Sequence, residues 1–103
     1  DTTEIPGVTL DDEGNIVEYC IETQCRSCFD NVRMVVEDAG ASWQEVVDVT
    51  VFLTDMKKDF AVFNRVYEQY LGEIRPCRTT VEVGALPTPI AIELKVTVYA
   101  PRD

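Results

Sequence analysis

The stretch Ile90-Ala91-Ile92-Glu93-Leu94-Lys95-Val96-Thr97-Val98-Tyr99-Ala100 decides the fold of this chain. Large apolar residues alternate along it with small, charged or polar ones, and this period of two is typical of a half-buried β-strand. One face of the predicted strand therefore belongs to a core. The other face is mixed, and we expect it to meet solvent or another subunit.

Earlier segments supply the rest of a small domain. Val46–Thr54 is β-branched and mostly apolar, which predicts a buried strand. Thr23 is a plausible N-cap for a first long helix that Gly40 ends, and Ser42 to Glu45 has capping-box spacing. The predicted elements are a loop or edge strand at 5–10, a turn at 11–15, an extended piece at 16–21, helices at 23–39 and 60–71, and strands at 46–54, 78–83 and 90–100.

This order indicates the α+β class. We expect two helices packed on one face of a small mixed β-sheet. The chain has 103 residues, enough for one domain and too few for two, so residues 1–103 form a single predicted domain. Because two helices cover only one face, self-association is the natural cover for the other.

Charge and composition exclude several functions. The net charge of −10 repels phosphate backbones and anionic membranes, so we expect no nucleic-acid or membrane partner. The sequence has no histidine, which removes Ser-His and Cys-His nucleophile pairs and every His-containing metal site. No apolar run approaches the length of a membrane span, and the polar start Asp1-Thr2-Thr3-Glu4 shows no signal peptide. The expected compartment is the cytoplasm.

Arg78 and Glu93 are the pair most suggestive of chemistry. An arginine fork matches a carboxylate, and a partly buried glutamate can act as a general acid or base. If their strands are neighbours, the two side chains form one small site. The alternative is a structural salt bridge, or a pair between Glu93 and Lys95, and spacing alone favours that alternative.

Other motifs are weaker. Cys25 and Cys28 have C-x-x-C spacing, but with Cys20 and Cys77 they form no zinc pattern, so we expect buried or incidental thiols rather than a redox site. An aromatic helix face is expected to be core, with the polar Asn64 beside it. Its members are Phe60, Phe63, Tyr67 and Tyr70.

Taken together, several motifs resemble the RidA/YjgF family of enamine/imine deaminases. The resemblance covers about residues 20 to 100. Within the family, Arg78-Thr79-Thr80-Val81, Leu86-Pro87-Thr88-Pro89 and Glu93-Leu94-Lys95-Val96 look most like 2-aminomuconate deaminase, whereas RidA itself usually has Ser-Cys after the arginine. The other motifs are Gln24 … Asn31 with Glu37-Asp38-Ala39-Gly40, the strand 47–56, Asp59-Phe60 … Asn64 … Tyr67 … Tyr70-Leu71, and Pro76-Cys77-Arg78.

The resemblance implies a fold and a site. The fold is chorismate-mutase-like, a homotrimer with a central barrel and sites in the clefts between subunits. Arg78 is then expected to hold a substrate carboxylate and Glu93 to act on the catalytic water. Asn64, Thr79 and Thr80 are expected to line the site, and no metal or organic cofactor is required.

The implied activity is hydrolysis of a carboxylate-bearing enamine or imine, with release of ammonia. A non-catalytic trimer that binds small carboxylates, an RNA-cleaving relative and a thiol redox protein are the alternatives. The chain departs from the family at its start, because members normally carry about one more β-hairpin ahead of Asp1. That hairpin is expected to be absent here, and either the protein is trimmed or its cleft is built differently.

Overall fold

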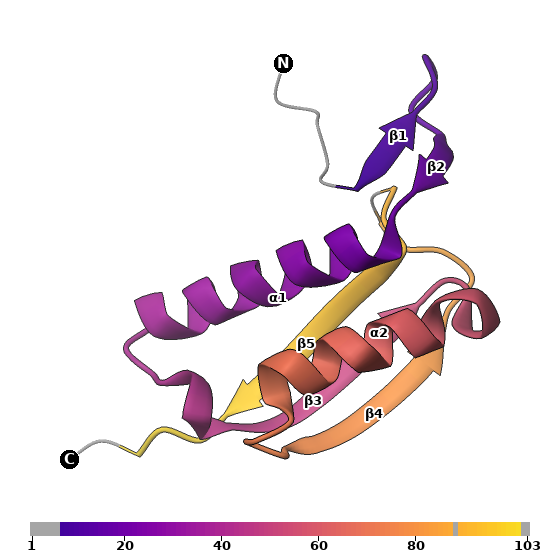
Figure 1. The fold of residues 1–103 in the computed structure, drawn as a ribbon. Coiled ribbons are helices and arrows are strands. Elements are labelled where there is room, and N and C mark those ends of the chain that lie inside the picture. The colour runs from indigo at the N-terminus through magenta and orange to yellow at the C-terminus, as the bar shows by residue number, and fades with distance from the viewer. Residues whose placement is uncertain (1–6, 88, 102–103) are drawn as a thin grey trace.

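The computed structural model describes residues 7–87 and 89–101, and Figure 1 shows its layers. A short hairpin precedes a long helix, and a mixed sheet with a second helix follows. The elements in chain order are β1 (Val8–Leu10), β2 (Ile16–Tyr19), α1 (Ile21–Asp38), the 3-10 turn η1 (Trp43–Glu45), β3 (Val46–Leu53), α2 (Met56–Leu71), β4 (Cys77–Glu82) and β5 (Ile92–Val98).

The main sheet has three strands in the order β4-β3-β5. β3 pairs parallel with β4, across the connection that contains α2, and antiparallel with β5. Both helices lie on the same face of this sheet (Figure 1). The predicted α+β arrangement of two helices on one face of a mixed sheet is confirmed.

The core lies between this sheet face and the helices. Val49, Val51 and Leu53 point from β3 toward the helices and are fully buried. Phe29 of α1 stacks on Tyr70 with 4.8 Å between ring centroids, and Phe63 of α2 is fully buried. Each such buried apolar side chain stabilises the fold by about 1.5–3 kcal/mol.

Both helices begin earlier than the sequence predicts. α1 starts at Ile21 with Cys20 as N-cap, so the prediction of Thr23 as N-cap is wrong; Thr23 lies in the first turn and its hydroxyl donates to Cys20 Sγ at 3.3 Å. α2 starts at Met56 rather than Phe60, because the Asp55 carboxylate accepts a hydrogen bond from Lys58 N at 3.2 Å.

Two predicted turns are confirmed. The side chain of Ser42 accepts from Gln44 N at 3.3 Å while Glu45 Oε1 accepts from Ser42 N at 2.8 Å, which is a capping box. The hairpin of β1 and β2 closes at 11–15, where Asp11 Oδ1 accepts backbone N–H bonds from Glu13 and Asn15, both at 2.9 Å.

Candidate functional site

Arg78 lies on the helix-facing side of edge strand β4. It pairs in register with Val49, a fully buried residue of that face, so its side chain extends toward α2. There Arg78 Nη1 donates a hydrogen bond of 2.7 Å to Asn64 Oδ1. The structure therefore brings together two of the predicted site residues from segments 14 positions apart.

Aromatic rings of α2 surround the same guanidinium. Its central carbon lies 4.7 Å from the ring centroid of Tyr67 and 5.7 Å from those of Phe60 and Phe63. Cation–π contacts at exposed sites stabilise by about 0.5–1 kcal/mol each and favour one position for the charge. The predicted core face of α2 thus has a second role that the sequence analysis missed. Residues 60, 63, 64 and 67 are spaced so that they share one face of a helix. This spacing is the sequence signal for the contact with Arg78.

No described residue neutralises the charge of Arg78 by an ion pair. Every ion pair found among residues 7–87 and 89–101 uses Arg26, Arg33 or Arg65, and none uses Arg78. The side chain is also exposed. Arg78 is therefore an exposed cation whose position is fixed by neutral neighbours and which forms no ion pair with a described residue. An arginine that binds an anion needs this arrangement.

Glu93 lies elsewhere. It is exposed on β5 and pairs with Phe52 of β3, so it faces the side of the sheet opposite to Arg78. With β3 between their strands and three residues of offset along it, the two Cα atoms lie about 14 Å apart. The interpretation that their strands are neighbours is wrong, and so is the intrachain salt bridge. Glu93 forms no ion pair with Lys95 in the described part of the chain either.

Thr79 and Thr80 point to different faces. Thr79 pairs with Thr50 on the open face, whereas Thr80 pairs with the buried Val51 and shares the face of Arg78. Thr80 Oγ1 is buried and has no hydrogen-bond partner among the described residues. On either side of it along β4, Arg78 bonds to Asn64 and Glu82 Oε1 accepts from Met56 N at 2.8 Å. The Thr80 hydroxyl is therefore a hydrogen-bonding group that the described residues leave unused, between two strand–helix links.

The cysteines do not form a reactive pair. Cys25 and Cys28 lie within α1 rather than before it. Burial raises the pKa of Cys25 to about 12 and that of Cys28 to about 11, and neighbouring charges (Asp59 for Cys25, Glu93 for Cys28) act in the same direction. Redox thiols need the opposite shift, toward thiolate. All four cysteines are free thiols.

Metal ions and membranes are two further kinds of partner to consider. In residues 7–87 and 89–101, no group of three or more Cys, Asp or Glu side chains is placed to hold a metal ion. Over the same residues, neither helix combines the length and the apolar character that a bilayer crossing requires.

Comparison with known proteins matches both sequence and fold to one family. Residues 4–100 match the family described as Endoribonuclease L-PSP. A RutC family protein of Pyrococcus abyssi is 42% identical over 93 residues, which are 89% of this chain and 72% of that protein. TdcF of Escherichia coli, named as a candidate reactive intermediate deaminase, is 36% identical over 73% of this chain and 60% of its own length.

Solved structures agree. RidA from the Antarctic bacterium Psychrobacter has a TM-score of 0.72 and 38% identity, covering 77% of this chain and 63% of that one. A Mycobacterium tuberculosis member of the YjgF/YER057c/UK114 family has a TM-score of 0.75 at 27% identity, covering 93% and 76%. The chain belongs to the RidA/YjgF family, described as Endoribonuclease L-PSP.

Proposed function

We propose that this chain is a subunit of a deaminase that hydrolyses enamines or imines bearing a carboxylate. The observation that carries the proposal is Arg78, an unpaired guanidinium held by Asn64 and by three aromatic rings. The family includes proteins named as reactive intermediate deaminases, which supports the reaction class. A planar, conjugated carboxylate suits both the guanidinium fork and the aromatic wall.

The proposed chemistry needs only a carboxylate and water. Arg78 holds the substrate carboxylate, and Thr80 Oγ1 donates to it from the same face. The enamine tautomerises to an imine, and a proton from solvent on the imine nitrogen makes its carbon electrophilic. Water attacks this carbon while Glu93 accepts a proton from the water. Glu93 then gives that proton to the amine of the tetrahedral intermediate, the C–N bond breaks as the hydroxyl group returns a proton to solvent, and the products are a keto acid and ammonia. General acid–base catalysis of this kind contributes about 10²–10⁴-fold.

The separation of Arg78 and Glu93 leads us to propose an intersubunit site. About 14 Å and a strand lie between them, too far for one small substrate to touch both within a single chain. In a closed cyclic trimer each subunit meets the next, so Arg78 of one subunit and Glu93 of its neighbour can line one cleft. The uncovered sheet face, which carries Glu93, is the surface that we assign to the barrel interior and its clefts (Figure 1).

We propose 2-aminomuconate as the first substrate to test, followed by 2-aminoacrylate. Both are enamines with a carboxylate next to the amine-bearing carbon. The motif Thr79-Thr80 after Arg78 supports the former. Four free cysteines suit a reducing compartment, and we propose the cytoplasm.

Ammonia release from both substrates tests the function. We expect Arg78→Ala to lower kcat/KM at least about 100-fold and Glu93→Gln to lower kcat by about 10²–10⁴-fold. Arg65→Gln and Glu68→Gln, both on the exposed side of α2, are matched controls that should keep wild-type rates. Full activity in Arg78→Ala and Glu93→Gln would refute the mechanism.

Two rival functions give different results in the same experiment. A non-catalytic carboxylate-binding trimer would release no ammonia, and its binding would require Arg78 but not Glu93. An RNA-cleaving enzyme, as the family description suggests, would cut RNA with a salt-dependent affinity. The net charge of −10 opposes the second rival.

A further inference from the structure

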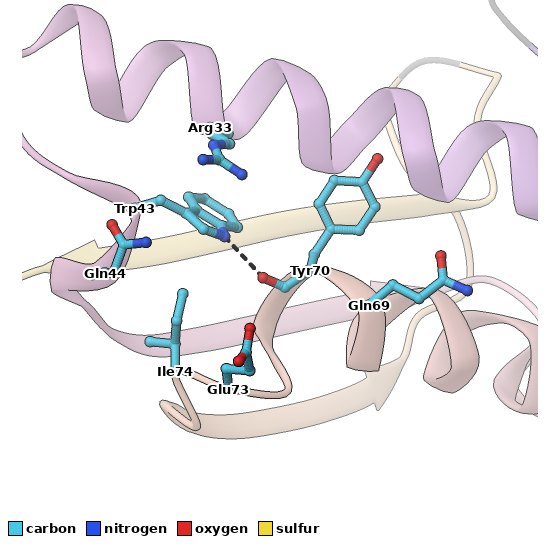
Figure 2. A pocket seen from close by; sticks show the side chains of 7 residues that line it. All are labelled: Arg33, Trp43, Gln44, Gln69, Tyr70, Glu73 and Ile74. Carbon is cyan, nitrogen blue, oxygen red and sulfur yellow. Dashed lines mark hydrogen bonds between the residues drawn. The ribbon is translucent and has the colours of Figure 1, made fainter.

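A hollow that is separate from the Arg78 site lies near the C-terminal ends of the two helices. Its residues come from α1, from η1, and from the end of α2 with the segment after it (Figure 2). Its volume of about 570 Å³ falls within the usual range of small-molecule sites. None of the residues assigned to the Arg78 site lines it. The lining residues are Arg33, Trp43, Gln44, Gln69, Tyr70, Glu73 and Ile74.

Specific bonds fix the walls of this hollow. Trp43 Nε1 donates a 2.9 Å hydrogen bond to the Tyr70 carbonyl, which Figure 2 shows as the dashed line. The Tyr70 hydroxyl donates to Asp30 Oδ1 at 2.8 Å. Arg33 Nε donates to Glu37 Oε2 at 3.2 Å, and the guanidinium carbon lies 5.8 Å from the Trp43 ring centroid. A site with fixed walls loses little entropy when a ligand enters.

Polar groups of the hollow are left available. Within residues 7–87 and 89–101, Arg33 is ion-paired with Glu37 through Nε, and its terminal nitrogens donate no hydrogen bond; the Glu73 carboxylate and the Gln69 amide form no hydrogen bond or ion pair. In the view of Figure 2, Arg33 reaches the indole of Trp43 from the α1 side and Glu73 lies on the other side of the ring. The hollow therefore carries a cation and an anion, and its wall contains Tyr70 and Ile74, which are half-buried, and Trp43, which is only 2% exposed.

These charges select the ligand. A simple anion attracted by Arg33 would also meet Glu37 and Glu73, in a protein of net charge −10. A simple cation attracted by Glu73 would meet Arg33. A molecule that carries both charges satisfies both groups, and the C-terminal end of α2 adds partial negative charge beside Glu73.

We propose that this hollow binds a small zwitterion with a carboxylate at one end and an ammonium group at the other. The carboxylate bonds to the terminal nitrogens of Arg33, and the ammonium group bonds to Glu73. The apolar stem lies against Tyr70 and Ile74, next to the largely buried Trp43. The inference goes beyond the deaminase and does not depend on it.

The test uses the only tryptophan of the chain, Trp43, as the reporter. Fluorescence titrations compare 5-aminopentanoate with pentanoate and pentylamine, which have the same stem and one charge each. We expect saturable binding of 5-aminopentanoate, at least about tenfold tighter than that of either single-charge probe. Arg33→Gln and Glu73→Gln should each weaken it about tenfold, whereas Lys57→Gln, away from the hollow, should not.

Calorimetric titration of the same variants separates binding from a change in Trp43 fluorescence alone. The proposal is overturned if the wild type shows no saturable binding, if the single-charge probes bind as tightly, or if Arg33→Gln and Glu73→Gln both bind like the wild type. Deaminase activity is not a readout here, so failure of this inference and failure of the proposed function remain distinct.

Discussion

At the scale of single residues, the way in which Arg78 is held explains why its charge remains available. Asn64 is neutral, so its oxygen orients the guanidinium without cancelling the charge. The rings of Tyr67, Phe60 and Phe63 add attraction but no formal charge. An aspartate at position 64 would occupy the fork that a substrate needs. Amide and aromatic neighbours are therefore the ones that suit an anion site.

The buried hydroxyl of Thr80 leads to a prediction. Thr80 Oγ1 has no partner in the described part of the chain, and under the proposed function the substrate carboxylate supplies one. Thr80→Val keeps the shape and removes the hydroxyl, so we expect KM for the carboxylate substrate to rise about 5- to 30-fold, as the loss of one hydrogen bond implies. Steady-state ammonia release measures this change.

Thr80→Ser is the matched control, since it restores the hydroxyl and should keep KM near the wild-type value. Stability gives a second readout. Removal of an unsatisfied buried hydroxyl should leave the free energy of unfolding of Thr80→Val unchanged or higher. A lower stability together with an unchanged KM would show that the hydroxyl serves the fold and not the substrate.

The sequence was sufficient for some site residues and not for others. Arg78 and Asn64 are identifiable because their types and family positions are distinctive, and the structure joins them. The faces of Thr79 and Thr80 depend on which neighbour of β4 sets the register, and that neighbour is far away in sequence. The position of β3 between Arg78 and Glu93 is equally non-local. Local patterns do not carry such information.

At the scale of elements, strand and helix identities follow from periodicity, while helix starts depend on caps. Asp55 lies between the predicted strand 46–54 and the predicted helix 60–71, and as an N-cap it extends α2 back to Met56. The extension matters for the site, because Met56 N then bonds to Glu82 on β4. The Asp55 cap thus positions the first turn of α2 against β4, the strand that carries Arg78.

The thiols inside α1 lead to a prediction on alkaline stability. Burial raises the pKa values of Cys25 and Cys28 above the ordinary value of 9.0 in the folded chain. The unfolded chain then loses these protons at lower pH than the folded one. Their contribution to stability is therefore complete below about pH 9 and is lost as the pH rises toward 11 and 12. Urea unfolding between pH 8 and 10 should show the decline.

The free energy of unfolding of Cys28→Ala should decline less steeply with pH than that of the wild type, because one thiol with a raised pKa has been removed. Cys77→Ala, which alters an exposed cysteine of β4, should keep the wild-type slope. The comparison concerns the slope of the free energy of unfolding against pH, so a uniform loss of stability in Cys28→Ala does not affect it. Equal slopes in all three proteins would contradict the assignment.

At the scale of the whole molecule, the proposed intersubunit site can be tested by mixing subunits. Arg78→Ala and Glu93→Gln are each expected to be inactive alone. When the two are unfolded together and reassembled at equal amounts, about one quarter of the clefts in a cyclic trimer should combine a wild-type Arg78 with a wild-type Glu93. We therefore expect recovery of about a quarter of wild-type ammonia release, with sedimentation confirming the trimer.

If both groups acted within one subunit, no mixed assembly would contain a complete site. Mixing would then give no recovery, which would exclude the intersubunit arrangement while leaving the assignments of Arg78 and Glu93 intact. Reassembly of each variant with itself is the control for the mixing procedure.

The placement of β3 between Arg78 and Glu93 also has a consequence for the cell. Under the proposed arrangement, a separated chain carries only half of each of two sites. Enzyme activity would then rise more steeply than protein concentration near the dissociation constant of the assembly, and dilution below that concentration would abolish activity. The expression level would then determine whether the enzyme is active, because the strand order of the sheet places Arg78 and Glu93 in different sites.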